Sequence, residues 1–137
     1  MADGTLIYRA REFATACHAD VNHTYAGKPY SVHLKMVYDV AERFIDLVDA
    51  GHHMTVLAAA WCHDVIEDTR RTYNDVVKAV GAPVADIVYA LTNEKGRTRR
   101  ERASDKYYAA IAADPLATYV KVCDRIANTT FSLSAGS

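Results

Sequence analysis

Apolar residues recur along the chain at the three- and four-residue spacing of amphipathic helices, and no segment shows the sustained alternation of a strand. This spacing predicts a first helix that ends near residue 17, followed by a polar loop over residues 18–29. It predicts further helices over residues 31–49, 55–67, 72–81, 83–91 and 116–128, and one that ends before Pro115. The pattern therefore indicates an all-α bundle with pockets between its helices.

The apolar stripes also predict which side of each helix faces the core. The inward residues are expected to be Leu6, Ala10, Phe13, Ala14 and Cys17 in the first helix, Val32, Met36, Val40, Phe44 and Leu47 in the second, and Val56, Leu57, Ala60, Trp61 and Val65 in the third. A polar residue that shares such a stripe should point into the bundle.

The composition is that of one ordinary domain. The 137 residues are 50% apolar and 24% charged, with a formal net charge of −1. This charge gives no indication of a nucleic-acid or membrane partner, and the sequence shows neither a signal peptide nor an apolar run long enough to span a membrane. Cys17, Cys62 and Cys123 are far apart among apolar residues, which predicts reduced core thiols. We therefore expect a single cytoplasmic domain over residues 1–137.

The segment WCHDVIEDT, residues 61–69, places charged groups beside apolar ones. Residues four apart lie one above the other on a helix, so His63 should stack with Glu67, and Asp64 with Asp68. An inward carboxylate is unfavourable unless a cation, hydrogen bonds or a metal compensates for the lost water. The segment is therefore a candidate metal or proton-transfer site.

A second carboxylate poses the same problem near the end of the chain. In VKVCDRIANT, Asp124 shares a stripe with Val120 and Ala127, and Asn128 follows one turn later. One metal ion bound by His63, Asp64 and Asp124 would resolve both cases.

The remaining histidines are candidates for a fourth ligand. His33 is favoured because it begins an amphipathic helix directly after the turn in GKPYSVH. His18 and His23 are weaker candidates at a helix end and in a loop, while His52 and His53 are expected to be exposed between helices. Two imidazoles and two carboxylates suit Mn²⁺ or Fe²⁺, and Zn²⁺, Co²⁺ or Ni²⁺ remain alternatives.

Other charged residues near this cluster suggest roles in catalysis and binding. Glu67 and Asp68 lie one turn beyond the expected ligands, where they could orient or deprotonate a water or protonate a leaving oxygen. The basic segment NEKGRTRRER, with Arg99 and Arg100, could clamp phosphates, although a run of this kind is more often a solvated surface.

The motifs HDVIEDT, upstream GKPYSVH and downstream VKVCDRIANT resemble those of the HD-domain metal phosphohydrolases. The similarity is greatest to the hydrolase domain of the RelA/SpoT homologues and to the small Mesh1-like hydrolases, and it extends over residues 10–128. The resemblance implies an all-α fold with one metal ion, usually manganese. It also implies hydrolysis of the 3′-pyrophosphate of a guanosine alarmone, ppGpp or pppGpp, giving pyrophosphate and GDP or GTP.

The resemblance also implies roles for individual residues. The metal ligands of the family fall on His33, His63, Asp64 and Asp124, the pair that positions the nucleophilic water falls on Glu67 and Asp68, and the nucleotide-contacting asparagine falls on Asn128.

The chain departs from the family in three places. Thr24 and Tyr25 stand where the family carries an Arg-Lys pair that holds the base and phosphates, and the loop has one extra residue. Tyr25 could instead stack on a base, and Lys28 could supply a charge. The segment between His33 and His63 is several residues longer than in typical relatives. Relatives usually continue through at least one more helix, which leaves a compact version, a truncated one or a chain completed by a partner.

Several functions stay open at this stage. The first is a manganese-dependent alarmone hydrolase with a small-molecule nucleotide substrate, and the second is an HD phosphohydrolase for another nucleotide, such as a nucleotidase, a nucleoside triphosphate pyrophosphohydrolase or an NADPH phosphatase. A non-cleaving nucleotide-binding module would have no need of Glu67 and Asp68. A purely structural helical protein would not explain inward-facing His63 and Asp64. The sequence also leaves a homo-oligomer open.

Overall fold

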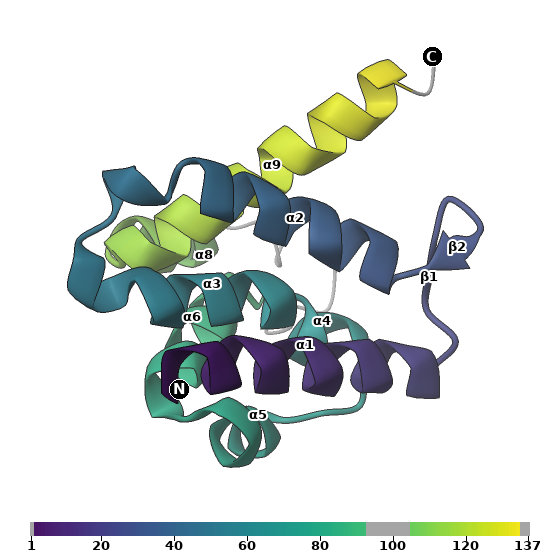
Figure 1. Ribbon diagram of the computed structural model, residues 1–137, viewed down its shortest axis with the longest axis horizontal. Coiled ribbons are helices and arrows are strands. Elements are labelled where there is room, and N and C mark those ends of the chain that lie inside the picture. Colours follow the sequence, from purple (N-terminus) through teal and green to yellow (C-terminus); the bar gives the residue numbers. More distant parts are fainter. Residues whose placement is uncertain (1, 93–104, 135–137) are drawn as a thin grey trace.

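The computed structural model describes residues 2–92 and 105–134, which form a helical bundle with one small hairpin (Figure 1). The α-helices are α1 (Ala2–Asp20), α2 (Ser31–Arg43), α3 (His53–Cys62), α4 (Val65–Asp68), α5 (Tyr73–Val80), α6 (Ala82–Leu91), α8 (Asp105–Ala112) and α9 (Pro115–Ser134). Two 3₁₀ turns, η1 (Ile45–Leu47) and η2 (Ala50–His52), link α2 to α3, and the strands are β1 (Thr24–Tyr25) and β2 (Lys28–Pro29). The predicted all-α fold is thus confirmed.

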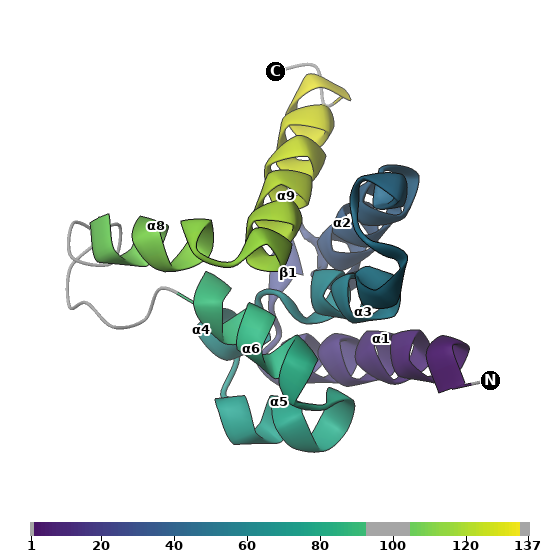
Figure 2. The same ribbon diagram turned by 90° about the vertical axis from the view of Figure 1, so that its left-hand side faces the viewer.

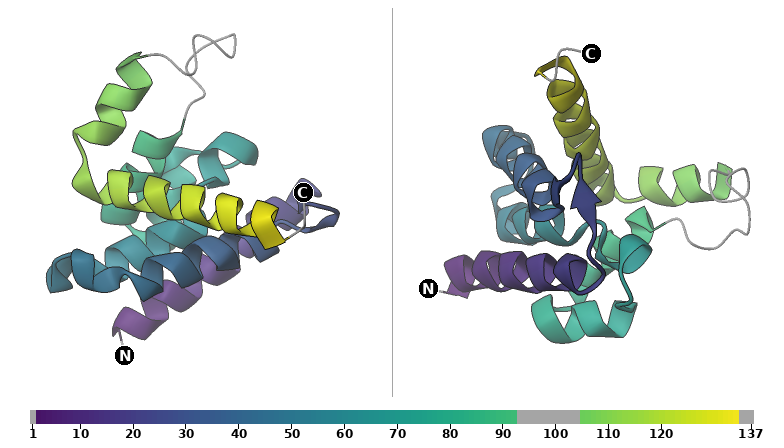
Figure 3. Two further views of the ribbon diagram at one scale, coloured as in Figure 1. Left: turned by 90° about the horizontal axis from the view of Figure 1, so that it is seen from above. Right: turned by 90° about the vertical axis from the view of Figure 1, so that its right-hand side faces the viewer.

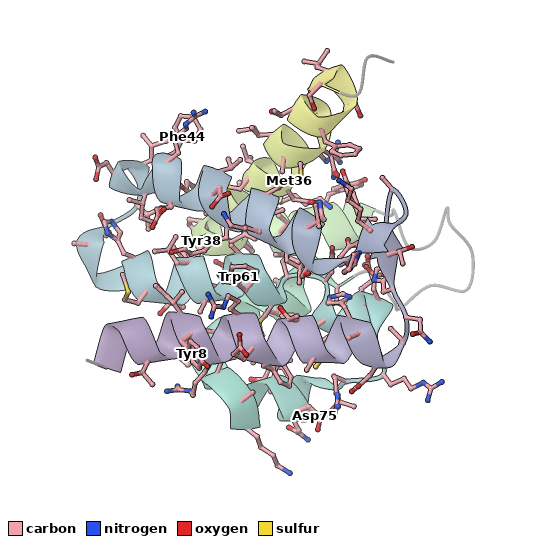
Figure 4. All side chains as sticks on the ribbon, turned by 45° about the vertical axis from the view of Figure 1, so that its right-hand side comes forward. Tyr8, Met36, Tyr38, Phe44, Trp61 and Asp75 are labelled. Carbon is pink, nitrogen blue, oxygen red and sulfur yellow. The ribbon has the colours of Figure 1, made fainter. Side chains whose placement is uncertain are left out.

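The centre of the bundle is α3, in which every residue from Val56 to Cys62 is buried. Figure 1 shows α1 and α2 on opposite sides of α3, and both helices pack directly against it. Tyr38 and Trp61 stack between α2 and α3 with ring centroids 5.4 Å apart (Figure 4). A helix covered on several sides needs apolar residues around its whole circumference, which explains the run VLAAAWC.

The last helix completes the core. Helix α9 packs against α2, α3 and α6 (Figure 3), and it buries Ala117, Val120, Cys123 and Ala127. Helix α8 leads into α9 through a sharp corner (Figure 2). At this corner, Asp114 Oδ1 accepts hydrogen bonds from the backbone N–H groups of Leu116 and Ala117, at 3.0 and 3.2 Å, and so caps the start of α9.

The second helix differs from its predicted form in length and orientation. It ends at Arg43, and its buried residues are His33, Leu34, Val37 and Ala41. The predicted stripe is therefore displaced by one position, and Phe44 and Leu47 are 40% and 80% exposed. Phe44 projects from the end of α2 in Figure 4. The displacement arises because α2 contacts both α3 and α9, and it brings His33 inside.

Two local features also depart from the sequence predictions. The predicted helix over residues 55–67 is interrupted between α3 and α4, at His63 and Asp64. The hairpin pairs Thr24 with Pro29 and Tyr25 with Lys28. Its turn residues, Ala26 and Gly27, have φ values of 52° and 80°, the left-handed region that a tight two-residue hairpin turn requires. Strands of two residues are too short to give a periodic signal.

Several other expectations agree with the structure, although α1 extends to Asp20, beyond its predicted end near residue 17. Helices α5 and α6 occupy the predicted ranges, whereas α9 extends to Ser134, beyond the predicted end at residue 128. All three cysteines are buried and free. Among the described residues, the helices all lack the combination of length and apolar character that crossing a bilayer would require.

Candidate metal centre and active site

Four of the residues singled out from the sequence converge where α2, α9 and the junction between α3 and α4 meet. His33 Nε2 lies 2.9 Å from Asp124 Oδ1 and 3.9 Å from Asp64 Oδ2. His63 Nε2 lies 3.0 Å from Asp64 Oδ2 and 3.5 Å from Asp124 Oδ1. His33 and His63 are only 1% and 4% exposed. Two imidazole nitrogens and two carboxylate oxygens therefore face one another at the edge of the core.

The hydrogen bonding of His63 tests whether this cluster fits a cation. Its Nδ1 lies 2.9 Å from the carbonyl oxygen of Ala60, which can only accept, so Nδ1 carries the hydrogen. In the neutral ring, Nε2 is then a bare lone pair directed at carboxylate oxygens, and within the described ranges this buried atom has no hydrogen-bond partner. Only a proton or a metal ion makes that arrangement favourable. His33, His63 and Asp64 offer ligand atoms within 4.8 Å of one another, so the donor set fits a divalent ion.

The electrostatics of the cluster favour ionised carboxylates. Burial alone would raise the pKa of Asp64, but interactions with His63 and a hydrogen bond from Tyr30 lower it to about 2. For Asp124, burial is likewise outweighed by the adjacent His33 and His63 rings, which hold its pKa well below the usual range. Burial would lower the pKa of His63, yet the two carboxylates raise it well above its usual value. At neutral pH the two carboxylates are therefore ionised, and they favour a positive charge between them, either a proton on His63 or a metal ion.

Helix α4 carries the two remaining acidic residues of the motif. Glu67 and Asp68 are exposed, and their carboxylates lie within 4.8 Å of each other and of Asp64. Partial desolvation, together with the charges of Asp64 and Glu67, raises the pKa of Asp68 to about 7. Asp68 can therefore exchange a proton near neutral pH, which suits a general acid or base.

Tyr25 and Asn128, which are 103 positions apart in the chain, meet beside the cluster. The Tyr25 hydroxyl donates to Asn128 Oδ1 at 2.7 Å, and Asn128 Nδ2 donates to Asp124 Oδ1 at 3.3 Å. The Tyr25 ring also stacks on His33, with centroids 4.7 Å apart. Phe131, which the sequence analysis did not identify, contacts Tyr25 edge-on at 5.0 Å. Its position one turn beyond Asn128 is the signal that could have identified it.

The structure gives no contact between the cluster and the basic residues that were predicted to bind substrate, within the part of the chain that it describes. Lys28 pairs with Tyr25 across the hairpin, but its side chain is exposed, and among the described residues it makes no hydrogen bond or ion pair to the cluster. Arg99 and Arg100 lie outside the described residues.

Tyr30 is a further residue that the sequence analysis did not identify. Its hydroxyl donates to Asp64 Oδ2 at 2.5 Å. The weaker candidates His18 and His23 contact the Tyr30 ring, and their Nδ1 atoms lie 2.9 Å apart. His52 is exposed as expected, whereas His53 is half-buried, with Nε2 2.6 Å from the Val48 carbonyl oxygen.

A separate apolar groove of about 860 Å³ lies on another part of the molecule, between α9 and the segment that follows α2. Phe44, Leu47, Val122 and Ile126 contribute to its lining, and none of the four converging residues does. The groove is therefore distinct from the candidate metal centre.

No protein-family model matches the chain. Over 126 residues it is 34% identical to a guanosine-3′,5′-bis(diphosphate) 3′-pyrophosphohydrolase of Aquifex aeolicus, an alignment that covers 89% of this chain and 17% of that protein. It is 30% identical over 117 residues to the Danio rerio protein of that name designated MESH1, covering 85% of this chain and 63% of the relative. The chain thus spans about a sixth of the bacterial relative and under two thirds of the fish one.

A solved structure has a similar fold. It is described as a metazoan ortholog of SpoT that hydrolyses ppGpp and plays a role in starvation responses. The TM-score is 0.70 at 25% sequence identity, and the match covers 90% of this chain and 67% of that one. The similarity therefore extends over nearly all of this chain in both sequence and fold.

Proposed function

We propose that this chain, a Mesh1-like HD-domain protein by sequence and fold, removes the 3′-pyrophosphate of ppGpp or pppGpp with the help of one divalent metal ion. The products would be pyrophosphate and GDP or GTP. The observation that carries the proposal is the convergence of His33, His63, Asp64 and Asp124, with Nε2 of His63 directed at both carboxylates. The activity for which these relatives are named supports the choice of substrate.

These four residues would hold the ion, with one nitrogen from each imidazole and oxygen from each carboxylate. A bound divalent ion lowers the pKa of water and polarises a phosphoryl oxygen. We choose Mn²⁺ because a mixed nitrogen and oxygen donor set suits it, with Fe²⁺, Zn²⁺, Co²⁺ and Ni²⁺ as the alternatives to test.

Glu67 and Asp68 would manage the water and its proton. Hydrolysis adds water across the bond between the 3′ oxygen and phosphorus, so one proton must leave the attacking water and one must reach the departing 3′ oxygen. Asp68, whose carboxylate lies beside those of Asp64 and Glu67, would accept the first proton and return it to the 3′ oxygen. Glu67, whose carboxylate lies beside that of Asp68, would orient the water.

Tyr25 and Asn128 would bind the nucleotide at the rim of the site. The Asn128 amide already bonds both the Tyr25 hydroxyl and Asp124, so a ligand that contacts it lies next to the metal ligands. Tyr25 offers an aromatic face for a base, and Lys28 on the same hairpin offers a positive charge. Arg99 and Arg100 remain predicted phosphate contacts.

A second candidate, hydrolysis of another nucleotide, is favoured by one observation. The hairpin presents the uncharged Tyr25 to the site, bonded to Asn128, where the resemblance leads us to expect a cation. Such a rim could accept a substrate with fewer phosphates beside its base.

The direct test is to incubate the purified chain with Mn²⁺ and ppGpp and to separate the products by anion-exchange chromatography, beside a panel of other nucleotides. We expect GDP and pyrophosphate in equal amounts. Cleavage of another nucleotide alone would support the second candidate. Retention of Mn²⁺ without turnover of any nucleotide would contradict both and favour a binding module. The single-domain organisation, the cytoplasmic location, the absence of a nucleic-acid partner and the oligomeric state remain predictions.

A further inference from the structure

The hydroxyl of Tyr30 contacts a carboxylate oxygen of the candidate metal centre. It donates to Asp64 Oδ2 at 2.5 Å. The same oxygen faces His63 Nε2 at 3.0 Å and His33 Nε2 at 3.9 Å. Tyr30 thus bonds a side chain that would bind the metal, without belonging to the set of nitrogen and carboxylate ligands itself.

The position of Tyr30 is fixed from both its backbone and its ring. Its N–H donates to the carbonyl of His23 at 3.1 Å, and its carbonyl accepts from the N–H of His33 at 3.0 Å. Its ring stacks on His23, with centroids 3.8 Å apart and planes inclined by 12°, and it contacts His18 at 4.6 Å. The Nδ1 atoms of these two histidines lie 2.9 Å apart. The hydroxyl therefore has little freedom to point elsewhere.

Asp64 has a competing local use for its carboxylate. It occupies the N-cap position of α4, where an aspartate ordinarily accepts a backbone N–H of the first turn, yet it makes no side-chain capping bond. To form a capping bond, the Asp64 side chain would have to rotate toward the backbone of α4. The short bond from Tyr30 opposes this rotation and keeps Oδ2 directed at His63. The residue pair lies 34 positions apart, so this effect exists only in the folded chain.

We propose that Tyr30 is a positioning residue of the metal centre, which holds the Asp64 carboxylate in its ligand orientation and is itself held by the stack on His23. This inference rests on the metal site of the proposed function but not on the identity of the nucleotide. Residues that orient metal ligands in this way typically change metal affinity by roughly 10–100-fold when they are removed.

The test measures Mn²⁺ binding to the full chain by calorimetric titration, without substrate. Tyr30→Phe should weaken binding by roughly 10–100-fold and change the electron paramagnetic resonance spectrum of bound Mn²⁺. The matched control is Tyr38→Phe, which removes a hydroxyl bonded to Glu42 at 3.1 Å on the same helix and should bind as the parent chain does. Parent-like affinity in Tyr30→Phe would overturn the proposal.

A second pair of variants covers the case in which Tyr30→Phe does not fold. His23→Ala removes the ring under Tyr30 and should weaken Mn²⁺ binding, whereas His23→Phe keeps an aromatic surface there and should restore it. Equal affinity in the two variants would contradict the positioning role. Because no nucleotide is present, a failure to hydrolyse ppGpp leaves these outcomes unaffected, while a parent chain that binds no divalent ion would overturn the metal site and the role of Tyr30 together.

Discussion

Helices α4 and α5 begin with the same arrangement of residue types, in Asp-Val-Ile-Glu at residues 64–67 and in Thr-Tyr-Asn-Asp at residues 72–75. Both have a capping residue followed three positions later by an acidic one, the pattern of a capping box. In α5 the box forms: Thr72 Oγ1 accepts from the Asp75 N–H at 3.3 Å, and Asp75 Oδ2 accepts from the Thr72 N–H at 2.9 Å. In α4 it does not, because Asp64 bonds Tyr30 and faces His63 instead.

The difference shows how tertiary contacts can redirect a local signal. Thr72 is exposed and has only its own helix to stabilise. Asp64 lies where two buried imidazoles and a tyrosine hydroxyl compete for its carboxylate, and its helix is only four residues long. Asp64 therefore has its carboxylate directed by contacts with distant segments rather than by its own helix.

The largest expected effect comes from removing the charge of Asp64. Asp64→Asn keeps the size of the side chain and an oxygen that can accept from Tyr30, but it removes one of the two negative charges that would bind the ion. We expect Mn²⁺ binding and nucleotide hydrolysis to be lost together, measured by titration and by product chromatography. Asp114→Asn is the control, because asparagine also caps helices well and Asp114 lies at the start of α9. Full activity in a metal-free Asp64→Asn chain would rule out the metal centre.

A smaller effect is expected at the other end of the same motif. Glu67→Gln should keep the metal, because Glu67 is not among the four converging residues, and should lower kcat by roughly 100- to 10,000-fold, the range for a group that handles protons or water. Metal titration beside steady-state kinetics separates the two effects. Unchanged kcat would exclude Glu67 from the chemistry.

The smallest effect is expected at α5 and concerns stability alone. Thr72→Ala removes the cap and should lower the free energy of unfolding by about 1 kcal/mol, which corresponds to a decrease of a few degrees in Tm for a domain of this size. Mn²⁺ affinity should not change. Thermal unfolding followed by circular dichroism measures the change in stability. A loss of Mn²⁺ binding in Thr72→Ala would contradict the view that Thr72 serves only the stability of its helix.

The sequence predicted the parts of the fold that depend on local pattern. Helical spacing predicted most of the helices, and the resemblance supplied the set of His33, His63, Asp64 and Asp124 that the structure brings together. An inward-facing charge can be recognised from its apolar neighbours alone.

The parts that were missed depend on contacts between distant segments. The inward face of α2 was displaced because this helix packs against two others, which one apolar stripe does not reveal. The break at Asp64 and the bond to Tyr30 require the hairpin, α2 and α4 to be assembled. The hairpin has two-residue strands, and the positive φ at Ala26 is unusual for a residue other than glycine.

The most direct test of the central claim is to strip the chain of metal with a chelator and to restore Mn²⁺ stepwise while measuring ppGpp hydrolysis and bound metal in the same samples. The metal-centre account predicts no turnover in the stripped chain and a rate that rises in proportion to bound Mn²⁺ until one ion is bound per chain. A stripped chain that hydrolyses ppGpp at the full rate would contradict it.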